Sequence, residues 1–140
     1  MATVKLHAEE IAERQLLAAI EFANNGNWVP AITLAGAAEE ILGKRLRRIG
    51  KEPSYDSMKA AVIEIARQAG EINPTIEKDI GYLINLTKNE LKHYSGNEAL
   101  EFDLEQDGAE LLERAIANYE LLSGTVRPEM IRFWSTYSET

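Results

Sequence analysis

Cysteine is absent from this chain of 140 residues, and the absence excludes several kinds of chemistry. There can be no disulfide framework, no zinc–thiolate centre and no thiol nucleophile, and a chain without disulfides fits a reducing compartment. Long apolar runs are lacking too, because no stretch approaches the roughly 18 apolar residues of a membrane span. Residues 1–10 show no apolar core of the signal-peptide type. We therefore expect a cytoplasmic protein with no membrane partner.

Basic residues are also scarce, since 15 Lys and Arg stand against 23 Asp and Glu and leave a net charge of −8. Nucleic-acid binders usually present a basic face to phosphate, so contact with RNA would require a local concentration of cations. One such cluster contains Lys44, Arg45, Arg47, Arg48 and Lys51. The same residues fit the C-terminal end of a helix, where cations interact favourably with the helix dipole.

The apolar residues recur at helical spacing along nearly the whole chain, with no glycine-rich phosphate loop, alternating strand pattern or internal repeat. Helices are expected over 4–24, 29–49, 56–69, 75–94 and 104–122, with a short last helix that opens at Pro128. Four of these are long, and short turns join them. The pattern predicts an all-α fold: an up-down antiparallel helical bundle of four long helices with additional short helices.

We expect a single domain over residues 1–140, with a core over about 4–122 and an aromatic C-terminal tail over 123–140. The tail either covers one end of the bundle or contributes to a dimer contact. Within the second expected helix, the small residues 35–38 would let a neighbouring helix approach closely.

Two stripes run along the expected helix 75–94 at about 100° per residue. The apolar stripe contains Ile76, Ile80, Leu83, Ile84, Thr87, Leu91 and Tyr94. The second stripe contains Tyr82, Leu86, Asn89 and His93. Its mixed character indicates a contact surface with His93 at its end. The alternative is a partly covered face on which His93 simply interacts with the helix dipole.

Most of the candidate chemistry lies in the segment 86–94, which contains one of the two histidines. Glu90 and His93 have the i, i+3 spacing of di-iron helical bundles, which need a second such pair. The other histidine, His7, follows Val4 at that spacing rather than a glutamate. A di-iron centre is therefore not expected, and a mononuclear or dimer-bridging site has no further support. We assign no metal and no cofactor.

Metal-independent RNA cleavage is the second chemical interpretation of this segment. It requires a group of near-neutral pKa to move protons, for which histidine is suited, and donors that stabilise the phosphorane. His93 meets the first need, and Lys88, Asn89 and Lys92 meet the second. One histidine makes a poor site, so two copies across a twofold axis would supply the missing group.

The stretch 88–93, Lys-Asn-Glu-Leu-Lys-His, resembles the signature of the HEPN superfamily. In that signature an arginine, commonly followed by a polar residue, is separated from a histidine by four to six intervening residues. The segment 31–43 resembles the second helix of small bacterial members, and the likeness extends over about 12–122. The resemblance implies a compact helical bundle that dimerises. Many members are metal-independent ribonucleases of toxin–antitoxin, abortive-infection or other defence systems.

By this resemblance His93 is the catalytic histidine, Asn89 its polar partner and Lys88 the residue at the arginine position. Lys92 would bind phosphate, and Glu39 would orient or neutralise these cations. Lysine lacks the planar fork with which arginine grips phosphate, so cleavage would be weakened or absent. The expected function is a HEPN-like homodimer that cleaves RNA, or binds RNA or a nucleotide, in a bacterial stress or defence system.

The alternative is a non-catalytic interaction module, because some HEPN proteins serve beside a nucleotidyltransferase or another partner. In that case Tyr82 and Leu86 would belong to an interface with a second copy, an antitoxin or a nucleotidyltransferase. The two interpretations differ in what they require of His93, which is essential for cleavage and dispensable for association.

Overall fold

The computed structural model describes residues 2–70, 75–96 and 98–137, apart from the side chains of residues 76 and 77. All regular structure in these residues is helical, which confirms the all-α prediction. The helices are α1 (Ala8–Asn24), α2 (Trp28–Arg48), α3 (Ser54–Gln68), α4 (Ile76–Ile84), α5 (Leu86–His93), α6 (Leu104–Ser123) and α7 (Pro128–Tyr137). None of the helices described is long and apolar enough to cross a membrane.

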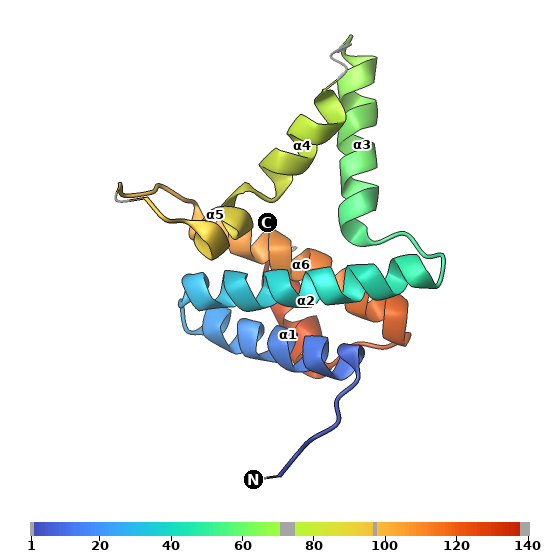
Figure 1. The fold of residues 1–140 in the computed structure, drawn as a ribbon, viewed down its shortest axis with the longest axis vertical. Helices are drawn as coiled ribbons and strands as arrows, with labels where there is room; N and C mark the ends of the chain where they lie inside the picture. Colours follow the sequence, from blue (N-terminus) through green and yellow to red (C-terminus); the bar gives the residue numbers. More distant parts are fainter. Residues whose placement is uncertain (1, 71–74, 97, 138–140) are drawn as a thin grey trace.

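Three long helices and the last helix form the main body of the molecule. α1 packs along α2, α2 packs along α6, and α7 lies against α1 and α6 (Figure 1). The apolar stripe of α1 is buried as its spacing predicts: Ala12, Leu16, Ala19, Ile20 and Ala23. From the aromatic tail, Met130 and Phe133 enter the same core. We call these four helices the main layer.

Local signals explain where α6 begins and ends. The Asp103 side chain caps its first turn by accepting a hydrogen bond from the Gln106 backbone N–H, at 3.2 Å. Gly124 ends it with φ of 75°, a left-handed conformation that glycine adopts without steric cost. These two residues fix the length of the helix that carries the polar residues of the candidate site.

α3 and α4 stand away from the main layer as a hairpin (Figure 1). They pack mainly on each other, and α3 also contacts α6. Ile63 is the one buried residue that the structure shows on these two helices, outside the side chains of residues 76 and 77. The up-down bundle of four long helices is therefore not confirmed. The structure shows three long packed helices with a projecting hairpin.

The helix expected over 75–94 is divided at Asn85 into α4 and α5. Its backbone there has φ of −102° and ψ of 7°, so the axis changes direction without a loop. The Asn85 Oδ1 atom accepts a hydrogen bond from Arg114 Nη2 on α6 at 3.5 Å. This tertiary contact holds the start of α5 beside the main layer, while α4 continues into the hairpin.

Candidate functional site

α5 carries four of the predicted site residues, but the structure gives them different environments. Lys88 is buried, with 8% of its surface exposed. Asn89 is half-buried, whereas Lys92 and His93 are exposed at the C-terminal end of the helix. The predicted set therefore divides into Lys88, which faces α2, the half-buried Asn89, and an exposed pair of Lys92 and His93.

The Lys88 side chain crosses directly over Gly36 of α2. A Cβ atom at residue 36 would lie 2.6 Å from the Lys88 Cδ atom and 2.8 Å from its Cγ atom, which is closer than contact allows. Glycine is therefore required for this approach. The close approach predicted from the small residues 35–38 is present, and the neighbouring group is the stem of a lysine.

The Lys88 ammonium group lies between two carboxylates of α2. Its Nζ atom is 3.4 Å from Glu39 Oε1 and 3.2 Å from Glu40 Oε1. Lys92 Nζ lies 3.7 Å from the second Glu40 oxygen. The suggestion that Glu39 neutralises the cations of the motif agrees with this geometry for Lys88. Lys88 is therefore paired within the chain rather than presented to solvent.

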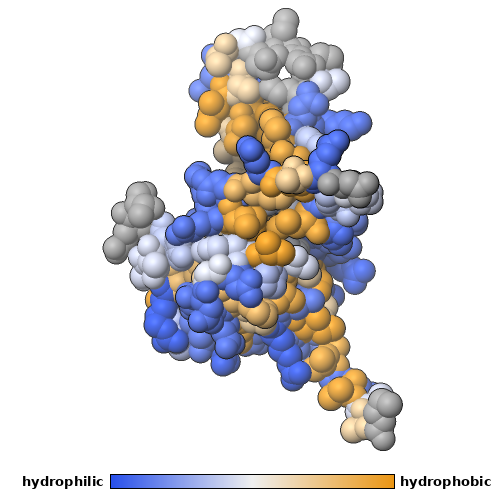
Figure 2. Space-filling view, turned by 90° about the vertical axis from the view of Figure 1, so that its left-hand side faces the viewer, coloured by the Kyte–Doolittle hydropathy of each residue, from blue (hydrophilic) through white to orange (hydrophobic). Residues whose placement is uncertain are grey.

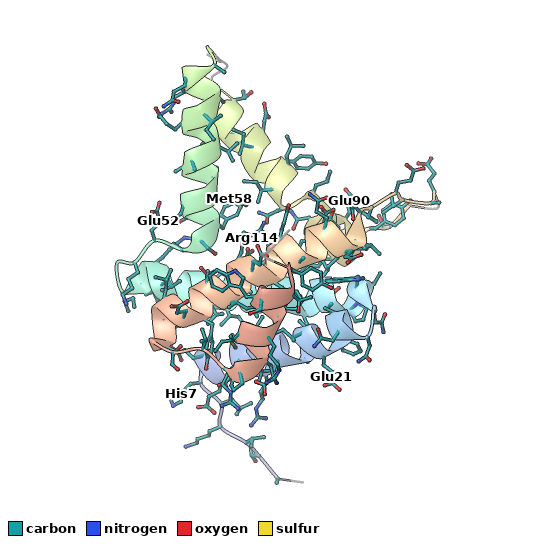
Figure 3. All side chains as sticks on the ribbon, turned by 180° about the vertical axis from the view of Figure 1, so that it is seen from behind. His7, Glu21, Glu52, Met58, Glu90 and Arg114 are labelled. Atoms are coloured by element: carbon teal, nitrogen blue, oxygen red, sulfur yellow. The ribbon has the colours of Figure 1, made fainter. Side chains whose placement is uncertain are left out.

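Arg114 completes this cluster from the opposite side and was not among the predicted residues. It is buried, and its Nε atom donates to Glu39 Oε2, so Glu39 bridges two buried cations. Figure 3 shows Arg114 on α6 at the foot of the hairpin. A signal for it exists in the sequence, because Arg114 lies three residues after Leu111 and one before Ala115, within the apolar stripe of α6.

Asn118, one turn further along α6, is fully buried and ties three helices together. Its Nδ2 atom donates to the Glu39 carbonyl oxygen at 3.5 Å, and its Oδ1 atom accepts from the Ser54 N–H at 2.8 Å. The Ser54 hydroxyl donates to the Arg114 carbonyl oxygen at 2.8 Å. The charged cluster is thus joined to the start of α3 by hydrogen bonds that satisfy its buried polar groups.

The cluster has a defined electrostatic character. Lys88, Lys92 and Arg114 face the carboxylates of Glu39 and Glu40, which leaves one uncompensated positive charge. Partial burial acts to raise the pKa of Glu40, but the nearby ammonium groups, chiefly that of Lys88, outweigh it and hold the pKa below its ordinary value of 4.5. Glu40 is therefore charged at neutral pH.

A pocket of about 200 Å³ opens beside this cluster. The residues that line it include Lys88 and Asn85, and also Lys44, Arg47 and Tyr55. Arg47 forms a bidentate ion pair with Asp56: its Nη2 atom donates to Oδ1 at 2.7 Å and its Nε atom donates to Oδ2 at 3.1 Å. This pair raises the pKa of the guanidinium group. The basic cluster predicted near residues 44–51 is therefore partly neutralised, and neither Asn89 nor His93 lines this pocket.

His93 is the last residue of α5 and is exposed to solvent. Among the residues that the structure describes, none forms a hydrogen bond or an ion pair with its side chain. Throughout the residues that the structure describes, no three His, Asp or Glu side chains converge in a way that would hold a metal ion. The imidazole is available to an incoming molecule, with the Lys92 ammonium group one residue before it.

The predicted contact stripe through Tyr82, Leu86, Asn89 and His93 is divided by the break at Asn85. Tyr82 is exposed on α4, in the hairpin. Leu86 is half-buried at the start of α5 and lines a second pocket below the hairpin. The four residues therefore do not form one face of one helix, and Tyr82 lies on a different helix from the candidate catalytic residue.

A scan of protein-family models finds no family that matches this chain, and searches of curated proteins and of solved structures find no significant match. The resemblance to HEPN proteins therefore stays a prediction that rests on the residues 31–43 and 88–93.

Proposed function

We propose that this protein is a HEPN-like homodimer that cleaves or binds RNA at the C-terminal end of α5, in the cytoplasm, as part of a stress or defence response. The observation that carries the proposal is the position of His93: exposed, next to Lys92, on a helix anchored to α2 and α6 by the buried cluster around Glu39. This arrangement presents a proton-transfer group and a cation together.

In the proposed reaction the ribose 2′-hydroxyl attacks the adjacent phosphorus, and the bond to the 5′ oxygen breaks. His93 accepts the proton of the 2′-hydroxyl, while His93 of a second copy protonates the leaving oxygen. The products are a 2′,3′-cyclic phosphate and a free 5′-hydroxyl. Lys92, with its ammonium group exposed, stabilises the charge that develops on the phosphoryl oxygens.

The structure suggests a different role for Lys88 from the one that the resemblance implies. Its ammonium group is held by Glu39 and Glu40, so a phosphate would have to displace two carboxylates to reach it. We therefore propose that Lys88 is a positioning residue that fixes α5 against α2. Phosphate contact is assigned to Lys92 instead.

A non-catalytic interaction module is the second candidate, and the burial of Lys88 is the observation that favours it. A site whose motif cation is already neutralised holds phosphate weakly, and the net charge of −8 repels RNA. In this case α5 would serve to dock a second copy, an antitoxin or a nucleotidyltransferase, and His93 would be dispensable.

The two candidates are separated by incubating the purified protein with single-stranded and structured RNA in the presence of a chelator. Cleavage by wild type and by His7→Ala, but not by His93→Ala, is the expected result. His7→Ala is a matched control, because His7 is also exposed and lies far from α5 (Figure 3). Absence of cleavage by folded wild type, or equal cleavage by His93→Ala, would contradict the ribonuclease proposal.

A further inference from the structure

The hairpin has an apolar surface that the described part of the chain leaves uncovered. On α3, Val62 is 39% exposed and Ile65 is 67% exposed, and on α4 Tyr82 and Leu83 are 58% and 65% exposed. Figure 2 shows hydrophobic surface over this part of the molecule. We call these four residues the hairpin face. Such a cluster of large exposed apolar residues is typical of an interaction site.

The hairpin is poorly supported by contacts within one copy. α3 has 15 residues and α4 has nine, and helices of this length are marginal in water unless a neighbour covers their apolar side. Ile63 is the one buried residue that the structure shows on them, outside residues 76 and 77. The hairpin would therefore gain stability from a partner that covered the hairpin face.

A notch of about 330 Å³ lies next to the hairpin face, between the hairpin and the main layer. Its apolar walls include Met58, Leu86 and Leu111, and Leu83 of the hairpin face lines its rim. Figure 3 shows Met58 and Arg114 at this notch, on α3 and α6. Two acidic and two basic residues, Asp107, Glu110, Lys88 and Arg114, also line the notch. An apolar ridge and a hollow of mixed character therefore lie side by side.

We propose that the hairpin face docks a second copy of this chain about a twofold axis, with Leu83 of each copy entering the notch of the other. This rests on the homodimer of the proposed function. A twofold interface must be complementary to itself, and an adjacent ridge and hollow satisfy that requirement. The proposal adds the surface through which the two copies meet.

Charge does not oppose the contact of two copies at this surface. Each copy carries a net charge of −8, so two copies repel unless they meet where charge is absent. The residues of the hairpin face, with Met58 and Leu86 in the wall of the notch, are uncharged. The charged residues of the notch are two acids, Asp107 and Glu110, and two bases, Lys88 and Arg114, so their charges sum to zero. Two copies can therefore approach here at a surface that carries no net charge.

Docking at this surface would also bring the His93 residues of two copies into one assembly. Leu86, in the wall of the notch, opens α5, and His93 ends it seven residues later, about 10 Å along the helix axis. The α5 helices of both copies would thus begin at the interface. The second histidine that the cleavage mechanism needs would come from the same assembly.

Sedimentation velocity on wild type, Leu83→Glu and Ile65→Glu tests the proposal. We expect a wild-type dimer and at least tenfold weaker dimerisation in both variants, with unchanged circular dichroism, because each removed side chain is exposed in the single copy. Ile131→Glu is the matched control: it removes an isoleucine that is 53% exposed on α7, outside the hairpin face, and should stay dimeric. His93→Ala should also stay dimeric.

The absence of cysteine allows a second test with the full chain. A short bismaleimide should cross-link two copies of the Leu83→Cys variant, whereas it should not cross-link two copies of Ile131→Cys. A wild-type dimer that persists in Leu83→Glu would overturn the hairpin face and leave the proposed homodimer intact. A wild type that stays monomeric at high concentration would overturn both.

Discussion

The main layer and the hairpin are built from the same kind of amphipathic helix and differ in what covers them. In the main layer the apolar stripes of α1, α2 and α6 face one another, and residues such as Leu16, Leu42 and Leu112 are fully buried. In the hairpin, Ile65 and Leu83 occupy equivalent stripe positions and stay exposed. A helical apolar pattern therefore predicts a helix with an apolar face, but it does not show whether that face is buried within the chain.

The same contrast exists within α5, between two lysines four residues apart. Lys88 points into the layer and is held by two carboxylates, while Lys92 points outward and keeps a single long contact with Glu40. We expect the first to govern stability and the second to govern binding. The predictions below test this division between inner and outer groups, from the largest expected effect to the smallest.

Removing the charge of Glu39 should lower the free energy of unfolding more than any other change considered below. Glu39→Gln leaves the buried Arg114 without its carboxylate partner and leaves Lys88 with Glu40 alone. Breaking a buried pair of this kind costs about 3–5 kcal/mol. Urea unfolding measures the free energy of unfolding. The matched control is Glu40→Gln, whose side chain is 40% exposed and whose loss should cost less than about 1 kcal/mol. Equal losses would contradict the bridging role of Glu39.

Truncation of a leucine compares the two regions directly. Leu112→Ala creates a cavity in the main layer and should lower the free energy of unfolding by about 2–5 kcal/mol. Leu83→Ala, at concentrations low enough for single copies, should change it by no more than about 0.5 kcal/mol. A large loss from Leu83→Ala in the single copy would show that the hairpin face is covered within the chain.

Two glycines of α2 test the contact between Lys88 and the layer. Gly36→Ala places a methyl group 2.6 Å from Lys88 Cδ and should cost about 1–3 kcal/mol by overpacking. Gly43→Ala meets nothing closer than 3.7 Å and should be neutral, or stabilising by up to about 1 kcal/mol through helix propensity. Thermal unfolding of both variants measures the difference. Equal stabilisation by both would mean that Lys88 does not pack over Gly36.

Acidification should weaken the outer part of the cluster, with the smallest effect. The Glu40 pKa lies below its ordinary value of 4.5 in the folded chain, so its contribution to stability is complete above that value. The contribution is lost as the pH falls through the lowered pKa. The difference in unfolding free energy between wild type and Glu40→Gln should therefore shrink below pH 4.5. A difference that grew on acidification would contradict a lowered pKa for Glu40 in the folded chain.

Much of the main layer could be predicted from the sequence, because its helices follow simple periodicity. The α1 stripe from Ala12 to Ala23 and the close approach at Gly36 are both present. The break at Asn85 could not be predicted, since the apolar pattern continues through it. At the break, Asn85 contacts Arg114, a residue nearly thirty positions away. The spacing of the apolar residues does not predict a contact over that separation.

The candidate site was predicted in its residues and not in their environments. The motif groups Lys88 with His93 in one site, yet one is buried and the other is exposed. Arg114 and Asn118 interrupt the apolar stripe of α6, and a search for polar residues at core spacing would have found them. Leu83 was placed in the apolar stripe, and its exposure follows from the projection of the hairpin.

The most direct test of the central claim, that the exposed end of α5 meets RNA, is a nuclear magnetic resonance titration of the two histidine rings. A short oligoribonucleotide with a methylated 2′ oxygen, which blocks cleavage, is added in the presence of a chelator, and His7→Ala assigns the signals. We expect the His93 ring signals to shift while those of His7 stay in place. Unchanged His93 signals at saturating RNA would contradict the account.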